Sequence, residues 1–300
     1  MKSRKLIEGP IADALVDAFA GKNPESVVRG FALHLHTSAL AGKGGPPYDP
    51  AAYAAWLGLP IERRDMAADG MLADWPGRSC RIILRERPRD ADSALSRREN
   101  FTVAHEIGHF MIRDELQWFV PRALLQRTNA DEERLCNCFA EELLMPSYRI
   151  VDDLSRCNGS PAALMALART YGVSLKVMLY RMSRALREEV FAAIWHKSDT
   201  GYRPSWATPL KFGHLVLCDT GSTTVERAFT ADGEVKGTDN VILNGNRMRW
   251  PCMSVRLSGR QVLTIGTRSR RASPWRQSIQ RDYPKPRPEG PAQLSLPLCA

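Results

Sequence analysis

The sequence predicts an α+β protein with a mainly helical region over residues 1–187, a small β-rich domain over residues 188–267 and a disordered basic tail over residues 268–300. Three observations predict this organisation. Apolar residues recur at helical spacing up to about residue 187, short apolar and β-branched runs separated by turn residues follow, and proline and charge replace periodicity in the tail. With 300 residues, 44% of them hydrophobic, the chain can bury the cores of about two domains.

The net charge of +9 is unevenly distributed. The tail has seven Lys and Arg against two acids, so +5 of the +9 belongs to residues 268–300. The remaining net charge of residues 1–267 gives little reason to regard this part of the chain as a DNA binder. No apolar run reaches 18 residues and the first ten residues lack the apolar segment of a signal peptide, which predicts a cytoplasmic protein without a membrane span. Seven cysteines without a CxxC pair predict reduced thiols.

The first half of the chain alternates helical and extended segments. Helical spacing predicts a helix over residues 24–41, and a turn-rich connector over residues 42–50 leads to a short helix over residues 51–59. Residues 79–84 (SCRIIL) have the β-branched, apolar character of a strand. A polar run then leads into FTVAHEIGH, residues 101–109.

His105 and His109 in this segment are four positions apart, so on a helix both imidazoles project from one face and can bind a single ion. Zinc suits this pair because it accepts imidazole nitrogen and lowers the pKa of water to about 7. Glu106, next to the first histidine, would take a proton from the attacking water and pass it to the departing amine. The pattern predicts zinc-dependent hydrolysis of a peptide bond.

The third ligand decides which kind of metal site this is. The extended metzincin pattern requires glycine and histidine where the chain has Ile112 and Glu115, so that pattern fails. The alternative is an acid from a helix predicted over residues 129–146, which begins with acids and ends at a proline. On that helix Glu133 could bind the metal while Asn137 orients a ligand. Asp131, Glu132 and Glu141 compete for the ligand role, and all these acids could instead form a solvated helix face.

Together, FTVAHEIGH and ExxCNxFAEELLMP (residues 133–146) resemble the ImmA/IrrE family of bacterial zinc metallopeptidases, whose members typically show FTLAHELGH followed by ExxANxFAAELLMP. Cys136 and Glu141 stand where alanine is common, and neither removes a functional group. The resemblance begins at PPYDP (residues 46–50) and ends near residue 187. It implies a zincin-like metallopeptidase domain over residues 1–187, with His105, His109 and Glu133 at the ligand positions of Zn²⁺ and Glu106 at the catalytic one.

The resemblance also implies a narrow substrate range. Family members often cleave a partner helix-turn-helix repressor, which releases a stress-response or mobile-element operon. We therefore expect a zinc endopeptidase with a protein substrate of this kind. Tyr148, Arg149 and Tyr171 are candidates for assisting the oxyanion, and the sequence does not choose among them.

Residues 160–187 have helix-turn-helix spacing, with a capping serine, Gly172 as a stop and Ser174 at the next start. One interpretation is a DNA-reading helix, which would make the protein a DNA-binding regulator with a structural metal. The other is a compact helical pair that closes the protease core, and it is the favoured one. The basic side chains that DNA reading would use are Lys176, Arg181, Arg184 and Arg187.

From Val190 the predicted strands include residues 191–197, 214–219, 222–229, 240–243, 253–257 and 261–267, and nothing in them indicates a ligand. The tail ends in QLSLPL, which looks like the hexapeptide that docks bacterial replication and repair proteins on the sliding clamp. Leucines would enter an apolar pocket while the glutamine hydrogen-bonds at its edge. A non-catalytic clamp adaptor is therefore a second alternative. The predicted motif comprises Gln293, Leu294, Ser295, Leu296, Pro297 and Leu298.

Overall fold

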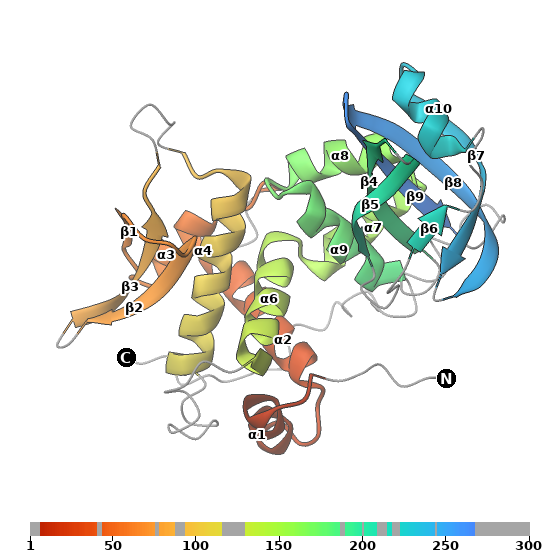
Figure 1. Ribbon diagram of the computed structural model, residues 1–300. Helices are drawn as coiled ribbons and strands as arrows, with labels where there is room; N and C mark the ends of the chain where they lie inside the picture. Colours follow the sequence, from red (N-terminus) through yellow and green to blue (C-terminus); the bar gives the residue numbers. More distant parts are fainter. Residues whose placement is uncertain are drawn as a thin grey trace. The chain divides into compact units, whose positions relative to one another are not determined.

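The computed structural model describes residues 7–40, 44–75, 78–87, 94–115, 130–186, 190–199, 201–208, 215–217, 223–243 and 245–267. Helices and strands are both abundant, which confirms the α+β class. The chain divides into two compact units (Figure 1), of which the first combines Met1–Pro146 with Ala168–Met178 and the second combines Ser147–Leu167 with Leu179–Ala300. The tail and its QLSLPL motif lie outside the described residues.

The first unit contains a small sheet and a set of helices, and the segments predicted as helices at residues 24–41, 51–59 and 129–146 and as a strand at residues 79–84 are confirmed within a few residues. The first helix and the first two strands were not predicted from the sequence. The elements are α1 (Pro10–Ala18), α2 (Pro24–Leu40), α3 (Pro50–Trp56), β1 (Ile61–Arg64), β2 (Gly70–Trp75), β3 (Arg78–Arg85), α4 (Arg97–Phe110), the π-helical turn η1 (Met111–Glu115) and α6 (Ala130–Leu144).

The sheet of this unit has the order β1-β3-β2, with β1 parallel and β2 antiparallel to the central strand β3. Helix α4 packs against β2, β3 and α6, and α6 also packs against α2. The approach of α4 to α6 depends on Gly108, because a Cβ atom built there would lie 3.1 Å from Cα of Cys136 on α6. The glycine in HEIGH therefore brings the two motif-bearing helices together.

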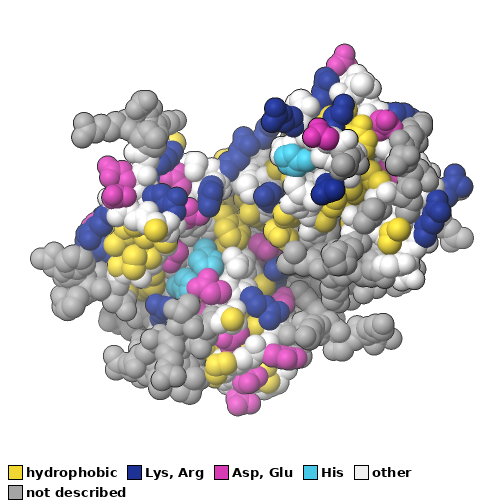
Figure 2. Space-filling view, in the orientation of Figure 1, with side chains coloured by type: hydrophobic (Ala, Val, Ile, Leu, Met, Phe, Trp, Pro, Cys, Tyr) yellow, Lys and Arg dark blue, Asp and Glu magenta, His cyan; other side chains and the backbone are white. Residues whose placement is uncertain are grey.

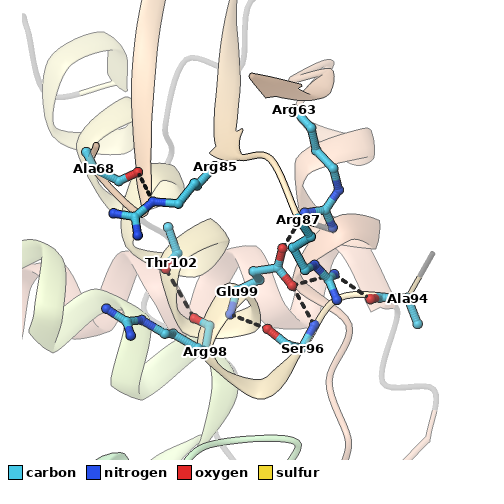
Figure 3. A network of polar contacts seen from close by, with 9 residues as sticks. All are labelled: Arg63, Ala68, Arg85, Arg87, Ala94, Ser96, Arg98, Glu99 and Thr102. Carbon is cyan, nitrogen blue, oxygen red and sulfur yellow. Dashed lines mark hydrogen bonds and ion pairs between the residues drawn. The ribbon is translucent and has the colours of Figure 1, made fainter. Parts of the chain in front are cut away.

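A polar network fixes the start of α4 (Figure 3). Ser96 and Glu99 form a reciprocal capping box, in which each side chain accepts from the other's backbone N–H. The Glu99 carboxylate also receives ion pairs from Arg63 on β1 and from Arg87. Burial would raise the pKa of Glu99, but the hydrogen bonds from Arg63 and Ser96 and the charge of Arg63 outweigh it and lower the pKa to about 2. The ionised carboxylate thus ties the helix to the sheet.

The second unit contains α7 (Ser147–Cys157), and it shares α8 (Pro161–Thr170) and α9 (Leu175–Leu186) with the first unit. Ser160 caps α8 by accepting from the N–H of Ala163, as its position before a proline predicts. Arg181 on α9 is buried and donates to Ser147 Oγ at 2.8 Å, so it is not available to contact DNA bases. This buried arginine favours the packed helical pair over the DNA-reading interpretation.

The rest of the second unit is a six-stranded sheet of order β5-β4-β9-β8-β7-β6, in which all hydrogen-bonded neighbours are antiparallel. Its core contains Phe191, Trp195, Trp250 and Val262. The strands are β4 (Val190–Ser198), β5 (Gly201–Thr208), β6 (Leu215–Leu217), β7 (Glu234–Leu243), β8 (Asn246–Ser258) and β9 (Gln261–Thr267).

The strand predicted at residues 222–229 is wrong: Thr224–Thr230 form the helix α10, which packs on β7, β8 and β9. Hydrogen bonds at the start of α10 explain the helix. Thr223 accepts from the N–H of Glu226, and the buried carboxylate of Asp239 accepts from the N–H and the hydroxyl of Thr224. Asp239 comes from a strand 15 positions away, so sequence periodicity alone did not reveal it.

No single helix in the described part of the chain has the length and apolarity of a membrane span, although α8 and α9, bent by 111°, pass that test as a pair. The described cysteines Cys80, Cys136, Cys138, Cys157 and Cys252 are free thiols, as predicted for them.

Candidate metal centre

The two histidines of the HExxH segment lie one turn apart on α4, with ring centroids 4.9 Å apart. Glu133, in the first turn of α6, faces both rings. Its carboxylate oxygens lie 3.2 Å from Nε2 of His105 and 3.3 Å from Nε2 of His109. The structure therefore brings all three predicted ligand side chains to one point.

These separations match the spacing of zinc ligands. Zinc–nitrogen and zinc–oxygen bonds of about 2.0–2.2 Å in a tetrahedral site place neighbouring donor atoms roughly 3.3–3.6 Å apart. The donor atoms of His105, His109 and Glu133 all lie within 4.8 Å of one another. Two imidazole nitrogens and one carboxylate are a donor set that zinc accepts, with a further coordination position available for water or substrate.

Both imidazoles are oriented through their second nitrogen by residues of α6. Asn137 Oδ1 lies 3.1 Å from Nδ1 of His105, as its predicted supporting role requires. Glu132 Oε1 lies 2.7 Å from Nδ1 of His109. Hydrogen bonds at Nδ1 leave the Nε2 atoms of both rings directed at Glu133.

Glu106 is mostly buried beside the histidines, and the backbone N–H of Leu72 on β2 donates to its carboxylate. Burial raises the pKa of Glu106, while the neighbouring charges of His105 and His109 oppose the rise. A raised pKa makes the ionised carboxylate a stronger base. This environment suits the general-base role that the sequence predicts for Glu106.

His105 and Glu133 shift each other's titration. Burial opposes protonation of His105, but its hydrogen bond with Glu133 and the charges of Glu106 and Glu133 outweigh burial and raise its pKa. The same hydrogen bond is the largest cause that lowers the pKa of Glu133, ahead of the opposing effect of burial. Without a metal, the pair therefore favours a proton at the position that a divalent cation would take.

The other acids of α6 have separate partners. Asp131 is buried and accepts from the backbone N–H groups of Ile11 and Ala12, so it caps α1. Glu141 is buried and lies 3.7 Å from Arg29 on α2. The interpretation of these acids as a solvated helix face is wrong for Asp131, Glu132 and Glu141, whereas the side chain of Glu133 is 43% exposed.

A pocket of about 440 Å³ opens at the metal centre. Figure 2 shows histidine side chains on this face, with acidic groups beside them and apolar surface next to them on the side of the sheet. The pocket is lined by Asp69, Gly70, Met71, Leu72, Phe101, Thr102, His105, Glu106, His109, Arg113 and Glu133.

Strand β2 presents backbone groups along the pocket. Arg85 donates to the carbonyl of Asp69, so alternate residues from Asp69 onward hydrogen-bond to β3. Gly70 and Leu72 consequently turn their backbone groups away from β3. Among the described strands β3 is the only neighbour of β2, so this is an edge where an extended peptide could pair.

Of the pocket residues that were not predicted from the sequence, Arg113 and Leu72 contact the site residues directly. Arg113 lies four positions after His109 on the same helical path, a spacing that could have revealed it. Leu72 acts through its backbone from a separate strand, which no local pattern shows. Of the oxyanion candidates, Tyr171 is fully buried against Tyr48 in the first unit and does not line the pocket; Tyr148 and Arg149 belong to α7 of the second unit.

The residues of this site lie within a segment that matches a known family. Residues 91–183 match the Peptidase_M78 family, described as the IrrE N-terminal-like domain. Over these residues the chain is similar to the ImmA/IrrE family. The family match includes both α4 and α6, and therefore all the side chains of the candidate metal centre.

The same region is also similar to individual proteins. It is 33% identical over 105 residues to the radiation response metalloprotease IrrE of Deinococcus radiodurans, covering 34% of this chain and 32% of that protein. It is 35% identical over 100 residues to the radiation response metalloprotease IrrE of Deinococcus deserti, covering 32% of this chain and 36% of that protein. The match thus spans about a third of each relative.

Among solved structures, a Mycobacterium tuberculosis transcriptional regulator matches with a TM-score of 0.48 and 14% identity, covering 86% of this chain and 82% of that chain.

Proposed function

We propose that the protein is a zinc-dependent endopeptidase that hydrolyses a peptide bond in a specific protein partner. The observation that supports this most directly is the convergence of His105, His109 and Glu133 from two helices, with Glu106 beside them on the pocket wall. Zinc and the site residues are assigned on this convergence and on the family match.

Each side chain has a distinct task in the proposed reaction. Bound by the three ligands, zinc would polarise the peptide carbonyl and make a water molecule acidic enough to act as a nucleophile near neutral pH. Glu106 accepts the proton of the attacking water at its carboxylate and delivers it to the departing amine. The Leu72 N–H holds that carboxylate towards the pocket.

The pocket walls indicate how a peptide binds. An extended segment can pair with the outward backbone groups of Gly70 and Leu72 on β2, which lie along the same pocket as Glu106. Met71, which is 45% exposed, and Phe101 offer apolar contacts, while Arg113 offers a positive charge. We expect a substrate segment with a large apolar side chain next to the cleaved bond.

The proposed partner is a helix-turn-helix transcriptional repressor whose cleavage releases a stress-response or mobile-element operon. The names of the two Deinococcus relatives, radiation response metalloproteases, support a stress-response role. A cytoplasmic location remains a prediction of the sequence.

The test combines metal analysis with cleavage assays. Purified protein is loaded with zinc and incubated with repressors encoded beside its gene. Glu106→Gln should retain zinc but lose cleavage, because the amide cannot accept the proton. Glu86→Gln, at an exposed acid after β3, is the matched control and should cleave like the unmodified protein. Full activity of Glu106→Gln would reject the mechanism.

The sequence also supports docking of the QLSLPL motif on a sliding clamp, and we propose it as a second, separable interaction. Deleting residues 293–300 should abolish binding to purified clamp while repressor cleavage in solution continues. A non-catalytic adaptor would instead lose its entire phenotype on this deletion. A DNA-binding regulator with a structural metal would show salt-dependent, sequence-preferring DNA binding that survives Glu106→Gln.

A further inference from the structure

Glu132 is an acid that the proposed reaction does not use. It precedes Glu133 on α6 and is fully buried, with a relative exposure of 0%. Its Oε1 atom lies 2.7 Å from Nδ1 of His109 and 2.9 Å from Nε of Arg113. Oε2 is buried and has no hydrogen-bond partner among the residues that the structure describes. A buried carboxylate held at one oxygen by these two groups requires an explanation.

The direction of the hydrogen bonds follows from the donors. The Nε–H of Arg113 can only donate, so Glu132 Oε1 accepts from it, and the same oxygen has a second lone pair for His109. His109 then carries its hydrogen on Nδ1 and has its lone pair on Nε2, the atom that lies 3.3 Å from Glu133. This is the tautomer that a metal ligand at Nε2 must have.

His105, the other histidine, has an uncharged partner at its Nδ1 atom. His105 faces the amide oxygen of Asn137, whereas His109 faces a carboxylate that is itself held by a guanidinium. A carboxylate polarises an imidazole more strongly than an amide does, because the hydrogen bond has a charged acceptor. The two ligands are therefore oriented by groups of different strength.

We infer that Glu132 is a positioning residue for His109, and that Arg113 holds the Glu132 carboxylate in place. Glu132 fixes the tautomer and orientation of His109 and makes Nε2 a stronger donor to zinc. This inference rests on the proposed zinc site. Arg113 also lines the pocket and its side chain is 31% exposed, so the orienting network extends from the buried interface of α4 and α6 to the substrate pocket.

Two other interpretations of Glu132 give different outcomes. In the first, the pair with Arg113 is a structural ion pair without effect on the metal. In the second, the donor atoms of His109, Glu132 and Cys136, which also lie within 4.8 Å of one another, bind the cation instead. The short contact between Nδ1 and Glu132 favours orientation over this second site, because that nitrogen is already engaged.

The test measures zinc affinity by competition with a chromophoric chelator. Glu132→Gln retains an acceptor oxygen and the shape of the side chain but removes its charge. We expect its zinc affinity to fall about 10- to 100-fold, the usual effect of losing an orienting partner. The d–d absorption bands of the cobalt-substituted protein should also shift, because His109 is a weaker donor in this variant.

Asp131→Asn is the matched control. Asp131 is the adjacent buried acid on α6, but its carboxylate accepts from the N–H groups of Ile11 and Ala12 and so caps α1. Asp131→Asn should lower the unfolding midpoint while the folded protein retains its zinc affinity. Arg113→Gln is the second variant, because this side chain is partly exposed and tolerates change more readily than Glu132. It should lower zinc affinity about 3- to 10-fold, less than the loss of the direct partner.

Wild-type zinc affinity in folded Glu132→Gln, or in Arg113→Gln if Glu132→Gln does not fold, would overturn the inference. Affinity that depends on Cys136 but not on Glu133 would overturn it as well, in favour of the second donor group. Glu133→Gln separates this inference from the proposed function. If it loses zinc while Glu132→Gln does not, only the positioning role fails; if neither it nor the unmodified protein binds stoichiometric zinc, the proposed function fails too.

Discussion

Substitution of Gly108 tests whether the metal centre depends on the close approach of α4 and α6. A Cβ atom at this position would lie 3.1 Å from Cα, 3.3 Å from Cβ and 3.4 Å from the carbonyl oxygen of Cys136. Carbon atoms are normally about 3.5–4.0 Å apart, so Gly108→Ala requires the helices to separate by roughly 0.5 Å. Because two of the obstructing atoms are backbone, a change of rotamer cannot relieve the contact.

Two opposing effects determine how much Gly108→Ala changes the free energy of unfolding. Replacing a glycine inside a helix with alanine gains about 0.5–1 kcal/mol of stability, whereas overpacking a core costs about 1–3 kcal/mol. We expect Gly108→Ala to lower the free energy of unfolding by about 1 kcal/mol. A separation of about 0.5 Å also exceeds the roughly 0.2 Å tolerance of zinc bonds, so zinc affinity should fall about tenfold.

Gly30 is the matched control, since it lies in α2 and a Cβ built there meets no atom within 4 Å. Gly30→Ala should stabilise the protein by about 0.5–1 kcal/mol and leave zinc affinity unchanged. Urea denaturation of the zinc-free protein and chelator competition measure the two effects. If Gly108→Ala is stabilised like Gly30→Ala and binds zinc normally, the close approach does not determine the site.

Three further outcomes are expected. Glu99→Gln should lower stability by about 2 kcal/mol at neutral pH, because it removes the carboxylate charge that pairs with Arg63 and Arg87. Folding lowers the pKa of Glu99 from 4.5 to about 2, so the stability that its carboxylate contributes is complete above pH 4.5 and is lost as the pH falls towards 2. In urea titrations, the free energies of unfolding of the variant and the unmodified protein should therefore converge near pH 2. Zinc affinity should weaken as the pH falls through a value above 6.5, because the raised pKa of His105 lets protons compete with zinc at a higher pH than they would for a free imidazole. A midpoint below pH 6.5 in zinc titrations at different pH values would contradict this. Asp239→Ala should destabilise the second unit by about 3 kcal/mol, because the N–H of Thr224 loses its acceptor and the hydroxyl of Thr224 keeps only Ser254 as a partner. Hydrogen exchange that increases only in α10 and the strands it packs on would report the loss.

Sequence patterns predicted those helices and strands whose type depends only on their own residues. Helix α6 has acids in its first turn and ends before a proline, and α4 begins with a capping box, so neither depends on distant residues for its type. Helix α10 does depend on a distant residue, because Asp239 caps it, and the β-branched residues around it resemble a strand. Strand β2 was missed for a related reason: it is short and acquires its role only through pairing with β3.

Within the metal centre, the sequence predicted the histidines because one helix holds both at a fixed spacing. The three consecutive acids of α6 were harder to tell apart. Successive residues on a helix point about 100° apart, so Asp131, Glu132 and Glu133 face three different neighbours. Those neighbours are the start of α1, Nδ1 of His109 and the Nε2 atoms of both histidines. Neither composition nor helix capping distinguishes the three acids. Each one acquires its role only through the packing of α1 and α4 against α6. The same packing places Glu133, the most exposed of the three, at the pocket.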